Sequence, residues 1–495
     1  MFKKQNLKSI SRRMENSQTY SEWSELAKSH DEASGREQWK AEDDCSLYDS
    51  DEIRSRYDNL SRLLDSGNYT ELLYALNEGI HGNMGGMGRP ILYSKAKYGG
   101  KQLIDDYVNV IVQSLNAIAN TSDQDISLAE KIDFFRRASH CYGRPALMLS
   151  GGAGLIYFHH GVVQTLIDND CLPNVISGAS AGSIIAAQLG TLSDEELKAG
   201  HFNKFRYDLS NDENPLLVLA GMREDYTSQL VKEKLLDSFP SDMTFQEAYE
   251  HTGRYINISI APTEKHQTSR LMNAITSPNV YVRSAVDASA SVPGVVSPVS
   301  LYAKGTDGKP KPYLPSRKWY DGSFSEDLPA KRLSRLFGVN HYMVSMINPF
   351  ALSFISDPKL DRTNKLSRLV KGVVLDSLKD VMLKTENSLS RYGSSFMSPA
   401  ILLAHAVLDQ QYTGDINIIL SKKDYHWRNV LFNYADPEEL NSLLLAGKRN
   451  TWPKLSMIKN STIISKKLDA ILEKLDLDEL DQIGVSHKRH LTTAM

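Results

Sequence analysis

The chain lacks the features that would place it outside the cell or across a membrane. It has only three cysteines in 495 residues, an odd number without metal-site spacing, so neither a disulfide-stapled secreted protein nor a zinc module is expected. No apolar run approaches the roughly twenty residues that span a bilayer. The basic first residues are not followed by the apolar segment of a secretory signal. These absences predict an intracellular, cytoplasmic protein without a signal peptide or transmembrane helix.

Excess charge of one sign is also missing. The formal net charge is −3, from 57 basic and 60 acidic residues, so no overall field would attract a nucleic acid. The hydrophobic content of 41% is ordinary for a globular protein. A chain of 495 residues is too long for one average domain. We therefore expect several domains and no nucleic-acid partner, whereas the oligomeric state stays open.

The most informative motif is Gly178-Ala179-Ser180-Ala181-Gly182. It follows the short apolar run Val175-Ile176 and precedes a segment that reads as a helix start, which is the layout of a nucleophile elbow. A serine on so sharp a turn has strained backbone, and a Cβ on either flanking glycine would collide with the neighbouring elements. The motif predicts Ser180 as a nucleophile, with Gly178 and Gly182 as the elbow glycines.

A second glycine-rich turn, Ser150-Gly151-Gly152-Ala153-Gly154, follows the apolar run 146–149 and precedes another helix start. Consecutive backbone amides in such a turn can bind phosphate or stabilise an oxyanion. The final glycine of a dinucleotide fingerprint is missing, which disfavours a nucleotide-binding protein. A tight turn without a ligand is the plain alternative. With a nucleophile elbow downstream, an oxyanion hole is the better interpretation.

A third motif is Asp321-Gly322, preceded by Trp319 and Tyr320. A lone Asp-Gly is usually only a turn. Two aromatic residues before it suggest a strand end that aims the carboxylate inward, where it could accept the serine proton as a general base. A Ser-His-Asp triad is the mechanistic alternative, because His341, His405 and His426 follow the aspartate. Their spacing gives none of them a special role.

In this order, the motifs resemble those of the patatin-like lipases, which use a Ser-Asp dyad. The likeness extends to the triacylglycerol lipases that carry a long N-terminal extension: Tyr20–Trp23 and Leu103–Tyr107 resemble that extension, and Thr276–Val280 and Thr451–Leu455 resemble later segments. The resemblance implies a lipid acyl hydrolase without metal or organic cofactor. It assigns Ser180 as nucleophile, Asp321 as base, and the amides of Gly151, Gly152, Ala153 and Gly154 as the oxyanion hole.

The resemblance also implies the fold, a three-layer α/β/α core with a mainly parallel sheet. Apolar runs at 146–149, 175–176, 255–260 and 341–347 alternate with helical patterns, which favours the same architecture. We expect a helical extension over residues 1–142, the catalytic domain over 143–350, and a helical region over 351–495. In the last region, a basic amphipathic pattern at 365–384 is typical of a solvated helix and, less often, of one lying on an anionic membrane.

The substrate class stays open between related lipids. The family's oxyanion loop usually has a further glycine, an arginine and another glycine where this chain has Ala153, Leu155 and Ile156. Loss of that arginine favours neutral acylglycerols over phospholipids. A phospholipase A or lysophospholipase with acyltransferase activity is the alternative enzyme, and a non-enzymatic lipid-surface scaffold is the alternative outside catalysis. In each case the expected partner is a lipid, met at a membrane or lipid-droplet surface.

Overall fold

The computed structural model describes residues 2–80, 83–204, 236–237, 239–240, 242–264, 267–292, 296–348, 351–352, 413–421, 424 and 437–482. These residues form two compact units. The first unit takes its described residues from Met1–Pro145, Gly338–His341 and Trp452–Met495. The second takes them from Ala146–Phe337 and Tyr342–Thr451. Segments far apart in the sequence therefore share one core in each unit.

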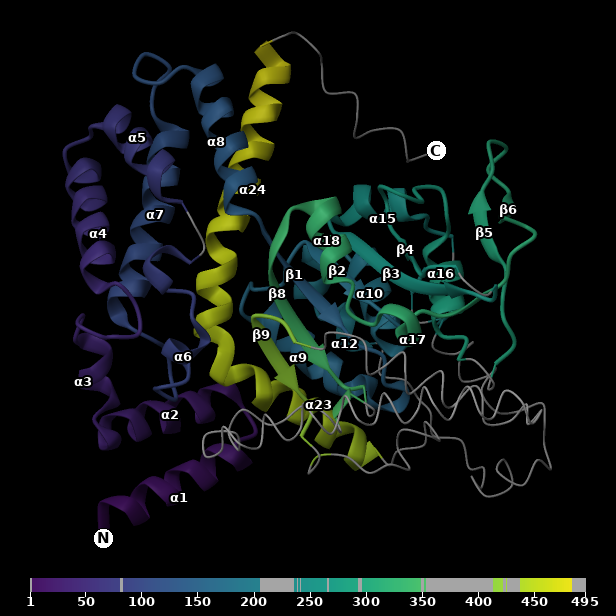
Figure 1. Ribbon diagram of the computed structural model, residues 1–495, viewed down its shortest axis with the longest axis horizontal. Helices are drawn as coiled ribbons and strands as arrows, with labels where there is room; N and C mark the ends of the chain where they lie inside the picture. Colours follow the sequence, from purple (N-terminus) through teal and green to yellow (C-terminus); the bar gives the residue numbers. More distant parts are fainter. Residues whose placement is uncertain are drawn as a thin grey trace, which may run out of the picture. The chain divides into compact units, whose positions relative to one another are not determined.

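The first unit is helical (Figure 1). The long helix at the end of the described chain, α24, packs against α7 and α8, and α4 packs against α7. The elements of this unit are α1 Phe2–Asn16, α2 Tyr20–Ser34, α3 Arg36–Ala41, α4 Ser50–Asp65, α5 Tyr69–Gly79, η1 Met84–Gly86, α6 Pro90–Tyr93, α7 Gln102–Asn120, α8 Leu128–Tyr142, η3 Trp452–Lys454 and α24 Leu455–Gln482.

Sequence signals account for several of these helices. Thr19 is the N-cap of α2, and its side chain accepts a hydrogen bond from the Glu22 amide. The carboxylate of Glu22 bonds the amide of Gln18, one residue before the position expected for a capping box. Helix α7 buries the apolar stripe that includes Leu103, Tyr107 and their neighbours one turn apart. The helical character expected for this region is confirmed.

The second unit is built on a sheet. Within the described residues it has seven strands, ordered β4-β3-β2-β1-β8-β9, with β7 also pairing with β3. The pairs β1–β2, β2–β3 and β8–β9 are parallel, whereas β4 and β7 run antiparallel to β3. The strands are β1 Arg144–Leu149, β2 Val175–Gly178, β3 Tyr255–Pro262, β4 Arg270–Met272, β7 Trp319–Asp321, β8 Val339–Met346 and β9 Ile416–Ile419. All four strands expected from the apolar runs are present.

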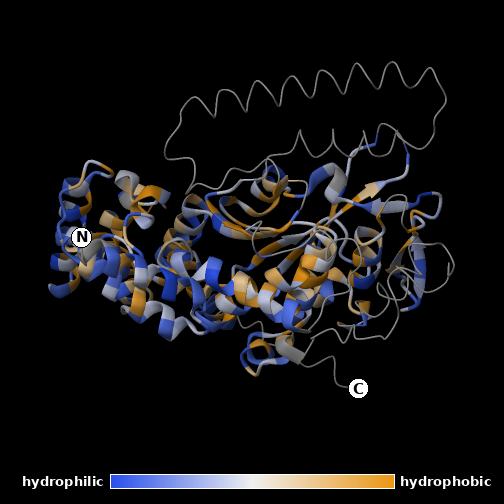
Figure 2. Cartoon of the chain, turned by 90° about the horizontal axis from the view of Figure 1, so that it is seen from below, coloured by the Kyte–Doolittle hydropathy of each residue, from blue (hydrophilic) through white to orange (hydrophobic). Residues whose placement is uncertain are grey.

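Helices lie on both sides of this sheet, so the expected α/β class is confirmed (Figure 1). Figure 2 shows hydrophobic residues concentrated in the strands and on the adjoining helices, and β2 is buried at all four positions, as expected for strands covered on two faces. The helices are η2 Ala153–Leu155, α9 Ile156–Asp168, α10 Ala181–Thr191, α11 Asp194–Lys198, α12 His201–Lys204, α15 Phe245–Thr252, α16 Val282–Ser289, α17 Ser323–Glu326, α18 Ala330–Phe337 and α23 Pro437–Thr451.

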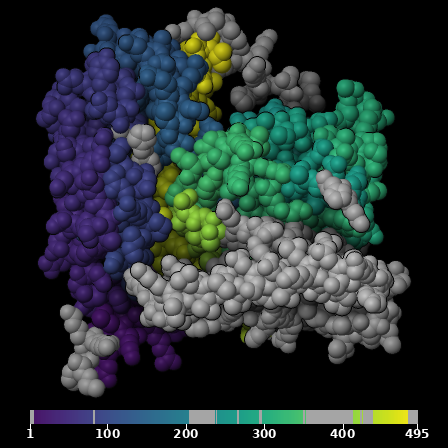
Figure 3. Space-filling view, in the orientation of Figure 1, coloured from purple at the N-terminus to yellow at the C-terminus, as the bar shows by residue number. Residues whose placement is uncertain are grey.

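The segment just before Asp321 forms a hairpin. Strands β5 (Leu301–Lys304) and β6 (Pro310–Tyr313) pair antiparallel as a separate two-stranded sheet. The hairpin projects from the second unit and reaches the surface (Figure 1 and Figure 3). The basic pattern expected at 365–384 lies outside the described residues.

Two glycines bring helices α9 and α23 into backbone contact. A methyl group on Gly161 of α9 would overlap the carbonyl of Leu444, and one on Gly447 of α23 would overlap the carbonyl of Phe158. The two helices therefore cross where each carries a residue without a side chain, and α9 is the helix that starts from the glycine-rich turn. This crossing fixes the helix behind that turn.

We expect Gly161→Ala to lower the free energy of unfolding by about 2 kcal/mol, because the added methyl forces the two backbones apart. Urea unfolding followed by circular dichroism measures this change. Ser442→Ala, at an exposed position of α23, is the matched control and should change stability by less than about 0.5 kcal/mol. Equal stability of Gly161→Ala and the wild type would show that the helices separate without cost.

Candidate active site

Ser180 occupies the strained turn that the motif predicts. It follows β2 directly and precedes α10, with φ 51° and ψ −122°, a region that residues with a side chain rarely adopt. Two contacts hold the strain in place. The Ser180 amide donates to the hydroxyl of Ser289 at 2.9 Å, and its carbonyl accepts from the hydroxyl of Ser183 at 2.6 Å. The backbone at the serine is therefore gripped from two sides.

The flanking glycines are required by space. A methyl group on Gly178 would overlap the carbonyl of Gly182, and one on Gly182 would overlap the carbonyl of Leu149. The backbone of the first turn of α10 therefore packs directly against the backbones of strands β1 and β2. Any side chain at either glycine would push the helix off the strands and relax the turn at Ser180.

Asp321 lies at the end of β7, next to β3, and is 1% exposed. Its Oδ1 accepts a hydrogen bond from the Ser323 amide at 2.8 Å, and the side chains of Ser180 and Ser323 lie close enough to influence the carboxylate. Burial raises the pKa of Asp321 to about 6, and the hydrogen bonds from Ser323 and Ser180 oppose that rise. A carboxylate with such a pKa is ionised at neutral pH and still basic enough to take a proton.

The glycine-rich turn lies against Ser180 and Ser323. A Cβ on Gly151 would stand 3.2 Å from the Cβ of Ser180 and 3.0 Å from that of Ser323. Ala153 has φ 46°, a left-handed conformation that is strained for a residue with a side chain. Among the hydrogen bonds recorded for the described part of the chain, none is donated by the amides of Gly152, Ala153 or Gly154. The Gly151 amide, by contrast, donates to the carboxylate of Asp327 at 2.7 Å.

Asp327 is a site residue that sequence reasoning missed. It is 1% exposed, and its second oxygen accepts from the side chain of Asn348 at 3.0 Å. Burial raises its pKa to about 7, the bonds from Asn348 and Gly151 lower it, and the charge of Asp321 raises it further. The only available signal was a carboxylate six residues after Asp321, which in the sequence looks like one acidic residue among many.

The histidines do not complete a triad within the described residues of this unit. His341 belongs to the segment Gly338–His341 of the first unit, and His405 and His426 lie outside the described residues. His159 is fully buried on α9 and contacts the loop through the carbonyl of Ser150 at 2.9 Å. His160 stacks on Phe202. Among the residues that the structure describes, Ser180, Asp321 and the glycine-rich turn thus come together without a histidine between them.

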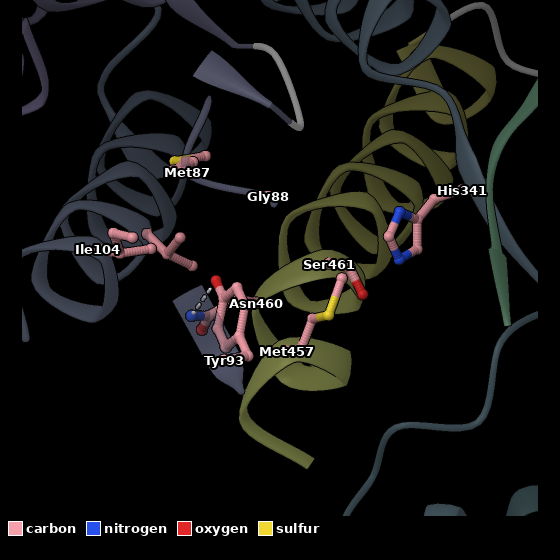
Figure 4. Close-up of a pocket in the computed structure, with 9 residues that line it drawn as sticks. Met87, Gly88, Tyr93, Ile104, His341, Met457, Asn460 and Ser461 are labelled. Carbon is pink, nitrogen blue, oxygen red and sulfur yellow. Dashed lines mark hydrogen bonds between the residues drawn. The ribbon is translucent and has the colours of Figure 1, made fainter. Parts of the chain in front are cut away.

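No group of three His, Cys, Asp or Glu side chains in the described part of the chain is arranged to hold a metal ion. No helix among the same residues is long and apolar enough to cross a membrane. The first unit has a small pocket, where the side-chain amide of Asn460 bonds the hydroxyl of Tyr93 at 3.2 Å (Figure 4). The same amide bonds Asp105 at 2.7 Å. None of the three motifs contributes to that pocket, so it is separate from the candidate active site.

Two segments of the chain match known protein families. Residues 1–140 match a domain of unknown function, DUF3336, and residues 147–333 match the family described as patatin-like phospholipase. A patatin-like phospholipase domain-containing protein of Pyricularia oryzae is 31% identical, covering 93% of this chain and 62% of its own length. Triacylglycerol lipase SDP1L of Arabidopsis thaliana is 30% identical, covering 92% of this chain and 57% of its own length.

The chain thus spans about three fifths of the length of these curated relatives. Among solved structures, VipD from Legionella pneumophila matches 64% of this chain and 67% of its own, with 13% identity and a TM-score of 0.30. The sequence relatives and the matched segment agree with the motifs described above. Residues 147–333, which contain Ser180, Asp321 and the glycine-rich turn, belong to the patatin-like phospholipase family.

Proposed function

We propose that this chain is a lipid acyl hydrolase, a triacylglycerol or acylglycerol lipase that works through a Ser180–Asp321 dyad. The observation that carries the proposal is that the Ser180 side chain lies close enough to the buried Asp321 carboxylate to lower the pKa of that carboxylate. A nucleophile and its base must be within hydrogen-bond reach. The strained turn at Ser180 and the glycine-rich turn beside it are the further supports.

In the proposed mechanism, Asp321 takes the hydroxyl proton as Ser180 Oγ attacks the ester carbonyl. The negative charge on the carbonyl oxygen is stabilised by backbone amides of the turn, each typically contributing about 3 kcal/mol. The amides of Gly152, Ala153 and Gly154 are the donors, since that of Gly151 is already bonded to Asp327. Asp321 then protonates the leaving alcohol. In the second half, Asp321 activates a water that releases the fatty acid and regenerates the serine.

Neutral acylglycerols are the preferred substrate in this proposal. The turn runs into η2 and α9 with Leu155 and Ile156, so these positions offer no cation to a phosphate group. The SDP1L relative is named a triacylglycerol lipase. The alternative is a phospholipase A or lysophospholipase with acyl transfer to alcohols, which the names of the other relatives favour. Triolein emulsions and phosphatidylcholine vesicles, compared at equal acyl-ester concentration, distinguish the two.

A lipid surface is the proposed partner, because such substrates are met as droplets or bilayers. A non-enzymatic scaffold at the same surface is the alternative outside catalysis. A fluorophosphonate probe separates these possibilities, since it labels a serine only when a base activates it. Labelling of the wild type and not of Ser180→Ala supports the enzyme, and failure to label either supports the scaffold.

We expect Ser180→Ala and Asp321→Asn each to lower kcat at least about a thousandfold, because one removes the nucleophile and the other removes its base. The measurement is hydrolysis of a soluble p-nitrophenyl ester, with product quantified by absorbance. His341→Ala is the matched control and should lower activity by less than about tenfold. An active Asp321→Asn enzyme together with an inactive histidine variant would reject the dyad in favour of a triad.

The activity should also depend on pH through Asp321. The base works in its ionised form, so kcat/KM should fall as pH drops through the folded-state pKa of Asp321, which burial raises to about 6. Below that pH the expected loss is about tenfold per unit. Circular dichroism at each pH confirms that the protein stays folded. An acid limb centred near pH 4 would mean that an ordinary, solvent-exposed carboxylate acts as the base.

A further inference from the structure

The peptide bond between Ser150 and Gly151 is held at both ends by buried side chains. Its N–H donates to Asp327 Oδ1 at 2.7 Å, and its C=O bonds Nε2 of His159 at 2.9 Å. Asp327 is 1% exposed and His159 is 0% exposed. A buried carboxylate and a buried imidazole thus face each other across one peptide group of the glycine-rich turn.

The contacts of His159 fix which of its nitrogens carries the proton. A carbonyl oxygen only accepts hydrogen bonds, so Nε2 must be the donor toward Ser150. Burial lowers the pKa of His159 to about 4, which leaves the ring neutral at pH 7 and Nδ1 without a proton. Nδ1 then accepts from the hydroxyl of Ser345 at 2.6 Å. The carbonyl of the same Ser345 accepts from the Ser150 amide at 3.1 Å, so the imidazole and the turn share one anchor on β8.

Asp327 is anchored independently. Its Oδ2 accepts from Asn348 at 3.0 Å, just beyond the end of β8, while Asp327 itself follows α17. The hydroxyl of Ser150 accepts from the Ile347 amide at 2.8 Å. Two side chains, one on α9 and one after α17, therefore grip this peptide group, while residues of β8 and just beyond its end bond both of those side chains and Ser150 itself.

Rotation of this peptide would break both bonds and leave buried polar groups unpaired, which is unfavourable away from water. The residues that follow it are Gly152 and Ala153, whose conformations, φ 168° and φ 46°, set the direction of the next amides. We propose that His159 and Asp327 are positioning residues that lock the Ser150–Gly151 peptide and thereby aim the Gly152 and Ala153 amides at the reacting carbonyl oxygen.

This inference rests on the proposed esterase function. In this inference, neither His159 nor Asp327 touches the substrate. Oxyanion stabilisation depends on donors held at a fixed distance from the developing charge, and a displacement of about 1 Å can reduce the rate about a hundredfold. Loss of either grip should therefore weaken stabilisation of the tetrahedral state while substrate binding in the ground state is preserved.

The experiment compares Asp327→Ala and His159→Leu, which remove one grip each, with Asp327→Asn and His159→Gln, which keep an acceptor or a donor there. Glu326→Gln is the matched control, since the Glu326 carboxylate faces Ser269 and Arg332 instead of the turn. The readouts are kcat and KM on a soluble p-nitrophenyl ester. A second readout is the affinity for a trifluoromethyl ketone, which forms a tetrahedral adduct with the serine.

We expect Asp327→Ala and His159→Leu to lower kcat about a hundredfold with KM changed by less than about threefold. Ketone affinity should fall in parallel, because the adduct needs the same amides. Asp327→Asn and His159→Gln should recover kcat to within about tenfold of the wild type, and Glu326→Gln should match it. Wild-type kcat and ketone affinity in both Asp327→Ala and His159→Leu would overturn the proposal.

Failure of the proposed function is recognised separately, by a wild type no more active than Ser180→Ala. In that case the rate of hydrogen exchange at the Gly151 amide measures how firmly the Ser150–Gly151 peptide is held. Exchange at least about tenfold faster in Asp327→Ala than in Glu326→Gln supports the lock, and equal exchange overturns it. If Asp327→Ala does not fold, the His159→Leu and His159→Gln pair tests the other end of the same peptide.

Discussion

The backbone contact at the carboxyl edge of the sheet is the constraint on which the site depends. Gly182 lies against the carbonyl of Leu149, and Gly178 lies against Gly182 itself, so the first turn of α10 is set directly on two neighbouring strands. Between β2 and α10 the chain passes through one residue of positive φ, which is Ser180. Strain at the nucleophile therefore follows from close packing, which a rigid parallel sheet can maintain.

The same edge gathers the remaining groups because of the sheet order. Strand β1, which leads to the glycine-rich turn, lies between β2 and β8, and β7 joins through β3. Asp321 therefore arrives from an antiparallel strand, about 140 residues after Ser180 in the chain, and its carboxylate meets the hydroxyl in a site from which water is largely excluded. Burial of this aspartate has an electrostatic consequence, since it raises the proton affinity that a general base requires.

Local sequence was sufficient for some of this architecture and insufficient for the rest. The strands before Gly151 and Ser180 were predictable because short apolar runs end at glycine-rich turns, and α7 was predictable from its stripe of apolar residues. Which helices pack against one another could not be predicted from the sequence. Helix α23 packs on α9, whereas α24 packs on α7 and α8, although both helices lie in the stretch expected to form one C-terminal region. Glycines at Gly161 and Gly447 mark the first contact, but a sequence does not state which two glycines meet.

The residues of the candidate site also fall into those that the sequence could predict and those that it could not. Ser180 and Asp321 carry motif signals because a nucleophile elbow and a strand-end aspartate constrain their immediate neighbours. Asp327 and His159 carry none, because their neighbours are ordinary and their partner is a backbone peptide that any sequence could supply. The structure thus separates groups that react from groups that hold the reacting geometry. Reactive groups leave a local sequence pattern, whereas supporting groups are recognised by burial without solvent contact and by bonds that end on the catalytic backbone.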